Sequence, residues 1–531
     1  MHTSIAVTAI LAFARVANAA FGFTATSKGY KVDTDGGLVF EVDKSNGDLI
    51  SLNYNGVEYQ GTGNASGINS GLGTSTVTAE TVNGYVKITV KSSGNPVTHY
   101  YVAKSKEATV YMATNNQGEV SPGELRFLAR LKTSELPTGV HGDVGDGRGC
   151  YAFEGDDTFM CDFGSTRSKM YTGDRFIEDK LHCVSGSKAQ ACMVMPGVAY
   201  ETSAGGPFMR DINSQTTDND QELYWYMNSG HVRTEDWRSG LQGPYALTFT
   251  AAGTTPSENL DTSFFGSLSI DGYVSESGRG SVTGKTSGVP DNFETVLHWF
   301  NKDAQYWTKA QGGDYKSPLM KSGSYTMKMY KGEFLVTTDS VIVTAGKTAT
   351  KNIASKEITS AAIWRVGEFE GQPFELKNGD KITRVHPSDA QMRAWGTPSV
   401  HIVGTTKASE FPAALWSKLL GGQVATVSFQ LTSAQVKAHV FRVGTTLSFK
   451  GGRPSVKVGS WTGSDPGAPK LIDSRGITRG AYRGYGEVYT WTVPASAFKE
   501  GSNTLTLGVS GDGDTNWLSA NYIIDAIELQ D

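Results

Sequence analysis

One stretch of the chain combines aromatic rings with a titratable side chain at the end of an alternating pattern. It runs from Leu223 to Arg233 and reads LYWYMNSGHVR. If it is a strand, Tyr224 and Tyr226 point to the same face, because side chains alternate along a strand. The chain then turns at Ser229-Gly230 and presents His231 at the strand's end. Amphipathic rings beside an imidazole suit the binding and cleavage of a sugar polymer, although a core strand with a structural histidine would give the same pattern.

A pair of arginines forms the second candidate. The segment Glu124–Leu131 reads ELRFLARL, and on a strand Arg126 and Arg130 share one face. Their Cα atoms would be about 13 Å apart, so only long side chains could reach a single carboxylate from both sides. Guanidinium groups suit that task because they bind carboxylates with several donors. The alternative is an ordinary charged face in contact with water.

A lysine lies in a third polar segment, Gly164–Met170, which reads GSTRSKM. Most such lysines are surface charges. Lys169 becomes a candidate base only if neighbouring arginines lower its pKa.

The composition indicates which elements must position these residues. The 531 residues include 63 glycines and 10% aromatic residues, and the apolar runs are short and rich in Val, Ile, Thr and Tyr. That pattern favours β-sandwiches joined by many turns, and the length suggests two to four domains. With a net charge of −5, the chain lacks the positive electrostatic field that is typical of nucleic-acid-binding proteins. We therefore expect no nucleic-acid partner.

The first residues are expected to be a targeting segment. An apolar run from Ile5 to Phe13 precedes Ala17-Asn18-Ala19, which is typical of a secretory signal peptide over residues 1–19. No later segment approaches the roughly 20 apolar residues needed to span a bilayer. We therefore expect a secreted, extracellular protein with no membrane partner.

Secretion bears on the four cysteines, which fall in one short part of the chain. In an oxidising compartment they should form disulfides. Three pairings are possible, and we favour the sequential one, Cys150–Cys161 with Cys183–Cys192. The sequon Asn64-Ala65-Ser66 makes Asn64 the expected glycosylation site.

Composition shifts divide the remaining chain into three units. Residues 20–266 carry the candidate residues above, residues 267–352 read as a small fibronectin type III-like sandwich, and residues 353–531 fit a jelly roll. In the last unit, Ser474–Gly486 interleaves arginines, tyrosines and glycines. Such a run could bind acidic sugars or dock against another domain, and the sequence leaves both readings open.

Taken together, these segments resemble the fungal rhamnogalacturonan lyases of polysaccharide lyase family four. The resemblance runs from Ala20 to the end of the chain and covers all three units. Its motifs are Glu124–Leu131, Thr166–Lys169, Gly205–Phe208, Arg210–Ser214 and Tyr224–His231, with shorter ones at Asp261–Phe265, His386–Asp389 and Asp473–Gly476. The resemblance implies an all-β fold: an N-terminal β super-sandwich resembling galactose mutarotase, a fibronectin type III-like sandwich, and a C-terminal jelly roll resembling carbohydrate-binding modules.

The resemblance also implies a chemistry. Family members cleave the bond from rhamnose to O4 of galacturonic acid in rhamnogalacturonan I by β-elimination, which leaves a 4,5-unsaturated uronate. By motif position, Lys169 is the expected base and His231 the expected acid. Arg126 and Arg130 would offset the uronate charge, and Tyr224 and Tyr226 would line the substrate groove.

The same resemblance implies no catalytic cofactor or metal and a monomeric enzyme. No ligand loop of recognisable spacing argues for a structural calcium ion in the third unit.

Other functions remain open from the sequence. A glycoside hydrolase acting on an acidic plant cell-wall polysaccharide needs two opposed carboxyl groups. Asp174, Glu178, Asp179 and Asp211 are candidates, but nothing in their spacing selects a pair. A non-catalytic sugar-binding protein would also fit the sandwiches, but it does not explain the clustered Arg, Lys and His. A mutarotase-like epimerase would fit the fold, but its small substrate would not need a long surface for a polymer.

Overall fold

A computed structural model describes residues 20–121, 123–357, 361–392, 395, 399–511 and 513–531. The expected signal peptide at residues 1–19 lies outside them. Within the described residues the regular structure consists of strands and short 3-10 helices, and no helix is long and apolar enough to cross a membrane. The fold is all-β, as the composition indicated.

The first unit is built from sheets of seven, five, four and three strands in the part of the chain that is described. The seven-stranded sheet has the order β15 (Leu181–Ser185), β16 (Ala189–Val194), β19 (Gly240–Ala251), β10 (Thr109–Asn116), β9 (Val97–Ala103), β8 (Tyr85–Ser92), β7 (Ser75–Val82). The five-stranded sheet runs β1 (Gly22–Ala25), β2 (Gly29–Asp33), β3 (Leu38–Asp43), β4 (Leu49–Tyr54), β5 (Val57–Glu58). The four-stranded sheet has the order β17 (Ser214–Thr216), β18 (Asp220–Asn228), β11 (Leu125–Lys132), β6 (Gly67–Ile68), and the three-stranded sheet runs β12 (Tyr151–Ala152), β13 (Thr158–Met160), β14 (Thr166–Ser168).

Alternating side chains hold these sheets together as layers. One face of the seven-stranded sheet, with Ile88, Met112 and Leu247, packs into the same core as Phe40 of the five-stranded sheet and Phe127 of the four-stranded sheet. The opposite face of the seven-stranded sheet is covered by a second apolar cluster that includes the segment after β19. The outer face of the four-stranded sheet carries a third cluster and the candidate residues.

The second unit is a smaller sandwich of two sheets. In one, β20 (Arg279–Ser287) pairs with β23 (Asp314–Lys316), β24 (Met320–Lys321), β27 (Thr348–Thr350) and β28 (Ile353–Ala354). The other has the order β22 (Gln305–Lys309), β21 (Thr295–Phe300), β25 (Gly323–Lys331), β26 (Phe334–Val343). Inward side chains such as Val282, Trp299 and Met327 fill the space between them.

The third unit is a sandwich of two five-stranded sheets. One has the order β29 (Ala362–Gly367), β38 (Asn521–Gln530), β33 (His439–Phe449), β36 (Glu487–Val493), with β31 (Ala414–Trp416) beside β38. The other runs β30 (Ser399–Ile402), β32 (Ala425–Leu431), β37 (Gly501–Ser510), β34 (Arg453–Val458), β35 (Trp461–Thr462). Their facing side chains form one core.

Short 3-10 helices join the strands. They are η1 (Asp162–Gly164), η2 (Lys169–Thr172), η3 (Ala199–Thr202), η4 (Ser263–Ser267), η5 (Glu276–Gly278), η6 (Gly379–Lys381), η7 (Ala408–Glu410), η8 (Leu419–Gly421), η9 (Ser433–Gln435), η10 (Gly476–Arg479), η11 (Ala495–Ala497) and η12 (Asn516–Leu518). Two of them, η2 and η10, bring residues to the candidate site.

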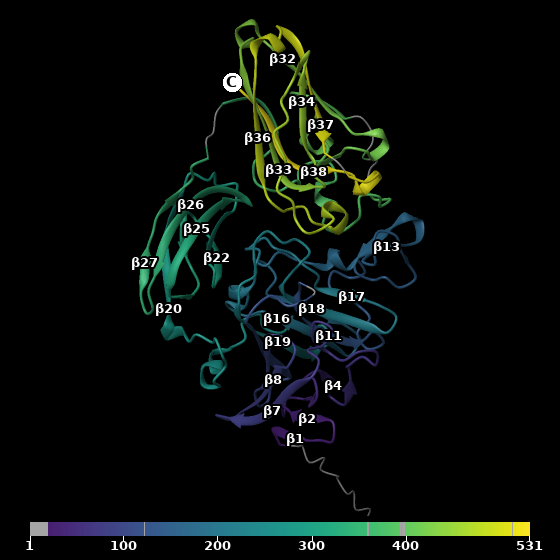
Figure 1. Cartoon of the computed structure of the whole chain (residues 1–531), viewed down its shortest axis with the longest axis vertical. Coiled ribbons are helices and arrows are strands. Elements are labelled where there is room, and N and C mark those ends of the chain that lie inside the picture. The colour runs from purple at the N-terminus through teal and green to yellow at the C-terminus, as the bar shows by residue number, and fades with distance from the viewer. Residues whose placement is uncertain (1–19, 122, 358–360, 393–394, 396–398, 512) are drawn as a thin grey trace, which may run out of the picture.

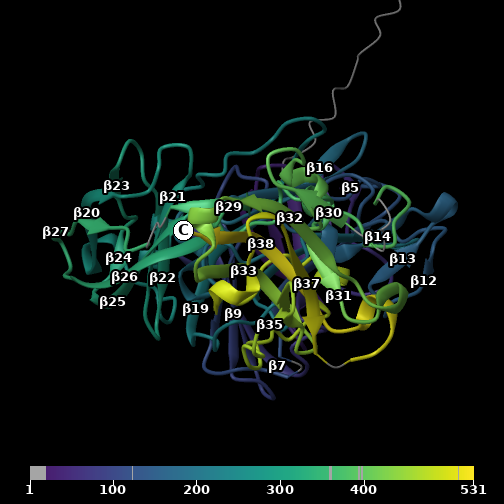
Figure 2. The same ribbon diagram turned by 90° about the horizontal axis from the view of Figure 1, so that it is seen from above.

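The three units contact one another. In Figure 1 the third unit stands on the first, and the second lies at the side of both; the view from above in Figure 2 shows the same neighbours. At the contact between the first and third units, the backbone N–H and hydroxyl of Thr166 donate to Asp389 at 2.6 and 2.7 Å. Nearby, His386 Nε2 lies 2.7 Å from a Glu154 oxygen. The third unit therefore rests directly on the segment that leads into Lys169.

Candidate active site

The candidate site is built on two antiparallel strands, β11 and β18. In their register Arg126 lies opposite Tyr226, and Leu128 lies opposite Tyr224. Leu128 and both tyrosines share the outer cluster, whereas Phe127 on the other face belongs to the main core. The alternation inferred from the sequence is therefore confirmed, and the face with Arg126 is the outer one.

The two tyrosine rings, which the resemblance placed along the substrate groove, are almost fully covered in this structure. Tyr224 is 3% exposed and Tyr226 is 2% exposed. Met170, Tyr171 and Ile212 complete the apolar cluster around them. Alternation shows which face a ring occupies, but the covering residues come from distant parts of the chain.

Arg126 is held by these rings and by a carboxylate. Its Nη1 donates to the hydroxyl of Tyr226 and lies 2.8 Å from Glu124 Oε2. The guanidinium carbon is 5.3 Å from the centroid of the Tyr226 ring and 5.7 Å from that of Tyr224. The buried tyrosines therefore fix the position of this cation.

Arg130 has a different set of partners. Its Nε lies 3.6 Å from Glu222 Oε1, and its Nη1 donates to the carbonyl of Ala65 at 2.7 Å. The two arginines thus pair with separate carboxylates in this structure. Convergence on one carboxylate, as the sequence suggested, requires a ligand that reaches both.

His231 lies between two carboxylates. Its Nδ1 is 3.1 Å from Asp211 Oδ1, and its Nε2 is 3.2 Å from Glu124 Oε1. The backbone N–H of His231 donates to the hydroxyl of Ser229 at 2.8 Å, which fixes the turn after β18. Burial lowers the pKa of the imidazole, but the Asp211 carboxylate and then Glu124 raise it by more, so the pKa lies above its ordinary value of 6.5.

Lys169 is the first residue of η2, directly after β14. The hydroxyl of Ser168 accepts from the N–H of Met170 at 3.2 Å, and the hydroxyl of Thr172 donates to the carbonyl of Lys169 at 2.7 Å. The ammonium group lies 2.7 Å from Asp157 Oδ1. The sequence suggested guanidinium groups beside this lysine, but its ion-pair partner is a carboxylate.

The other oxygen of that carboxylate binds an arginine from the third unit. Asp157 Oδ2 lies 3.1 Å from Arg479 Nη2, at the end of η10. Burial raises the pKa of Asp157, but Lys169 and then Arg479 lower it by more, so the pKa lies below its ordinary value. Asp157 is therefore an anion shared by two cations.

The candidate acid and base have matching surroundings. His231 shares Glu124 with Arg126, and Lys169 shares Asp157 with Arg479. The sequence pointed to Arg126, Arg130, Lys169 and His231 but not to Arg479. It gave no role to Glu124 or Asp157. Glu124 could be noticed only as the first residue of the motif that carries Arg126, and Asp211 only as a candidate carboxyl group of a hydrolase.

A cavity between the first and third units adjoins His231. Its lining includes Asp211 and Arg210 from the first unit, and Arg479 and Tyr482 from the third. Among the residues that the structure describes, no group of three or more His, Cys, Asp or Glu side chains is arranged to hold a metal ion. The charged side chains that line the cavity are arginines and Asp211, together with His231.

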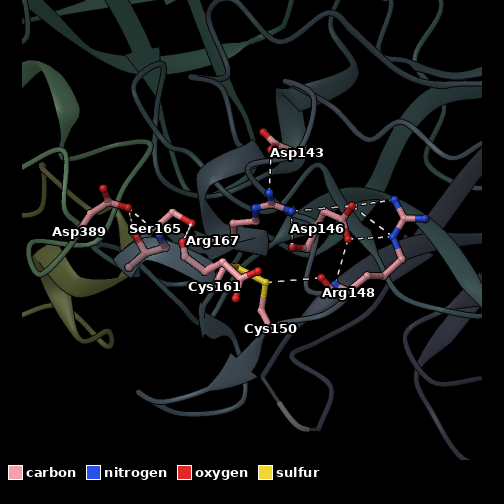
Figure 3. The surroundings of a disulfide bond; sticks show 10 residues. Asp143, Asp146, Arg148, Cys150, Cys161, Ser165, Arg167 and Asp389 are labelled. Carbon is pink, nitrogen blue, oxygen red and sulfur yellow. Dashed lines mark hydrogen bonds and ion pairs between the residues drawn. A yellow bond between two sulfur atoms is a disulfide. The ribbon is translucent and has the colours of Figure 1, made fainter.

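A disulfide closes the small sheet that carries Asp157. Cys150 and Cys161 are joined across the β12–β13 hairpin, and the second disulfide links Cys183 to Cys192, so the pairing is sequential. Figure 3 shows the first bond next to the ion pair of Arg167 with Asp143, which measures 2.8 Å. The irregular segment before Lys169 is thus tied by one covalent bond and several charged contacts.

The remaining candidates lie elsewhere. Asn64 is exposed, as a glycosylation site must be. The four carboxylates considered for a hydrolase are each bound to a basic side chain: Asp174 to Arg384, Glu178 to Arg175, Asp179 to His182 and Asp211 to His231.

Comparisons with known proteins agree with this architecture. Residues 21–272 match the family described as rhamnogalacturonan lyase B, N-terminal; residues 278–351 match polysaccharide lyase family 4, domain II, and residues 362–529 match domain III of that family. Rhamnogalacturonate lyase A of Emericella nidulans is 48% identical over 522 residues, with 97% of each chain covered. Probable rhamnogalacturonate lyase A of Aspergillus fumigatus is 47% identical and rhamnogalacturonate lyase A of Aspergillus aculeatus 46% identical, again with 97% of each chain covered. The chain belongs to polysaccharide lyase family 4 and is a polysaccharide lyase.

Proposed function

We propose that this enzyme is a secreted endolyase that cleaves rhamnogalacturonan I. The bond broken is that between C4 of galacturonic acid and the oxygen that links it to rhamnose. The products are a 4,5-unsaturated galacturonate at the new non-reducing end and a rhamnose with a free reducing end. The relatives' names support the substrate.

One observation carries the proposal. A lysine and a histidine, which can serve as base and acid, lie among arginines that can offset the charge of a uronate. Each of the two is linked to an arginine through a single carboxylate, Asp157 or Glu124. This arrangement suits an elimination, which needs proton removal, charge stabilisation and proton donation in one place.

In the proposed reaction Lys169 takes the proton from C5 of the galacturonate. The electron pair of that C–H bond forms the C4–C5 double bond, and the bond from C4 to O4 breaks. His231 gives its proton to the departing O4. Arg126 and Arg130 stabilise the negative charge that builds up on the carboxylate side of C5.

Lys169 has to be neutral to accept a proton, yet in the free enzyme it makes an ion pair with Asp157. Substrate binding therefore has to change the partner of Lys169. His231 is already suited to its role, because its raised pKa keeps the imidazole protonated at mildly acidic pH.

The product distinguishes this function from hydrolysis. An eliminase creates a conjugated alkene that absorbs in the ultraviolet, so absorbance and reducing ends should rise together when the enzyme acts on rhamnogalacturonan I. Reducing ends that appear without absorbance would show hydrolysis instead.

Two variants test the proposed roles. We expect Lys169→Ala and His231→Ala each to lower kcat at least about 100-fold, the usual contribution of a positioned acid or base. Binding of rhamnogalacturonan oligosaccharides should be largely retained. Lys180→Ala is the matched control, because Lys180 is an exposed lysine of the same region. Near-normal kcat in either site variant would refute its role.

We also propose that the elimination needs no metal ion, since arginines can supply the positive charge. The initial rate should be unchanged after treatment with a chelator. A rate that falls with the chelator and returns with added calcium would contradict this.

A further inference from the structure

Asp157 joins the first and third units at the candidate base. One of its oxygens pairs with Lys169 at 2.7 Å and the other with Arg479 at 3.1 Å. A single carboxylate is thus held between an ammonium group and a guanidinium group. The carboxylate of a uronate bound in a lyase could form ion pairs with the same two cations.

Arg479 is fixed in this position by the docking of its loop. The carbonyl of Gly480 accepts from Arg210 Nη1 at 2.9 Å, and the carbonyl of Thr478 accepts from the hydroxyl of Tyr171 at 3.4 Å. Gly480 has a φ of +69°, and a Cβ there would lie 2.9 Å from the Tyr171 ring. The loop therefore fits closely against the first unit and directs Arg479 toward Asp157.

Arg479 also retains an unused donor. Its Nε is buried and has no hydrogen-bond partner among the described residues. The side chain lines the cavity together with His231. An arginine that only linked two units would gain from satisfying this donor, because an unpaired buried donor is costly.

The position of Lys169 relates Arg479 to the substrate. The base has to reach the hydrogen on C5, and C5 carries the carboxylate of the uronate. A guanidinium that shares one carboxylate with Lys169 is therefore placed within reach of the carboxylate of a galacturonate bound for elimination. Replacing Asp157 by the substrate would leave Arg479 paired and would free Lys169 from Asp157.

We propose that Arg479 of the third unit is a uronate-binding residue, and that Asp157 occupies the uronate's carboxylate position until substrate displaces it. This inference rests on the proposed function of the site. It makes the site a composite of two units and makes Asp157 an internal competitor of the substrate.

The central test separates contact with substrate from contact with Asp157. Asp157→Asn should lower KM at least about threefold, because a neutral amide competes poorly with a uronate for two cations. Arg479→Gln should raise KM about tenfold, at the lower end for loss of a hydrogen bond to a charged group. The kcat of Arg479→Gln should stay within about threefold of the original.

The double variant decides the matter. In the Asp157→Asn background Arg479 has lost its internal partner, so Arg479→Gln should still raise KM about tenfold if the arginine binds substrate. If that increase disappears, Arg479 acts only through Asp157 and the proposal is wrong. If the KM of Asp157→Asn is unchanged or higher, Asp157 does not compete with the substrate, and that part of the proposal is wrong.

A matched control removes the effect of domain docking. Arg384 of the third unit and Asp174 of the first form a similar pair at 2.9 Å. Arg384→Gln and Asp174→Asn should change KM less than about twofold. An increase in KM like that of Arg479→Gln would point to loosened docking and overturn the proposal.

If Arg479→Gln does not fold, Arg479→Lys replaces it. We then expect a smaller rise in KM, and an unchanged KM would count against the proposal. A wild-type enzyme that gives no ultraviolet absorbance would instead refute the proposed function.

Discussion

At the scale of single residues, the two carboxylates around His231 should set the alkaline limit of activity. The pKa of His231 is raised, so the imidazole keeps its proton to higher pH than an ordinary histidine and loses it as pH rises through the raised pKa. Asp211→Asn removes the largest charge that raises this pKa. We expect the alkaline limb of the plot of kcat/KM against pH to move to lower pH. The pH profile is measured by ultraviolet absorbance. An alkaline limb that stays in place or moves to higher pH would contradict this role of Asp211.

The same residues show what a sequence can tell about a site. Arg126 and Arg130 could be placed on one face of their strand, and Tyr224 and Tyr226 on one face of theirs, because strand alternation is a local rule. Asp157 and Arg479 could not be found, because their contact joins positions more than 300 residues apart in the chain. The sequence also could not show that the tyrosines are buried, because their burial depends on which distant residues cover them.

At the scale of elements, the two disulfides should differ in their effect on catalysis. Each closes a loop of about ten residues, worth about 2–3 kcal/mol in the chain-entropy model. Cys183 and Cys192 face each other across β15 and β16, at one edge of the seven-stranded sheet. The other bond closes the three-stranded sheet that holds Asp157 beside Lys169.

Replacing both cysteines of either pair by serine should lower the thermal midpoint to a similar degree. Only the Cys150/Cys161 variant should also change kcat/KM, by at least about threefold, because its hairpin carries a site residue. The Cys183/Cys192 variant serves as the control and should stay within about twofold. Equal kcat/KM in the two variants would show that the hairpin does not need its covalent bond.

At the scale of the whole molecule, strand and turn patterns in the sequence predict the three sandwiches. They do not predict the contacts between the three units. The run Ser474–Gly486 left sugar binding and docking equally open. The structure shows that part of this run docks: the hydroxyl of Tyr485 donates to the carbonyl of Thr234 at 2.9 Å, and Arg483 lies 3.0 Å from Glu333 of the second unit. These contacts depend on partners in other units, and no local pattern encodes them. Docking leaves room for sugar binding by Arg479 of the same run, as proposed above.

Glu333 connects all three units. Its side chain is fully buried, and its Oε1 lies 2.7 Å from Arg175 Nη1 of the first unit. Its Oε2 lies 3.0 Å from Arg483 of the third unit, and the hydroxyl of Tyr482 donates to Oε1. One buried carboxylate therefore pairs with two half-buried guanidinium groups, of which Arg175 also pairs with Glu178.

Glu333→Gln should destabilise the enzyme by about 3 kcal/mol, the lower end of the cost of removing one partner of a buried ion pair, because both arginines are partly exposed and Arg175 keeps Glu178. It should also lower kcat/KM, because the site contains residues of the first and third units and Glu333 binds both. Glu294→Gln is the control: Glu294 pairs with Lys309 at 2.7 Å near the surface of the same unit, where such a pair contributes about 0–1 kcal/mol. Calorimetric midpoints and kcat/KM that are alike in the two variants would mean that the units hold their arrangement without Glu333. A larger loss in Glu333→Gln would show that this carboxylate keeps the composite site assembled.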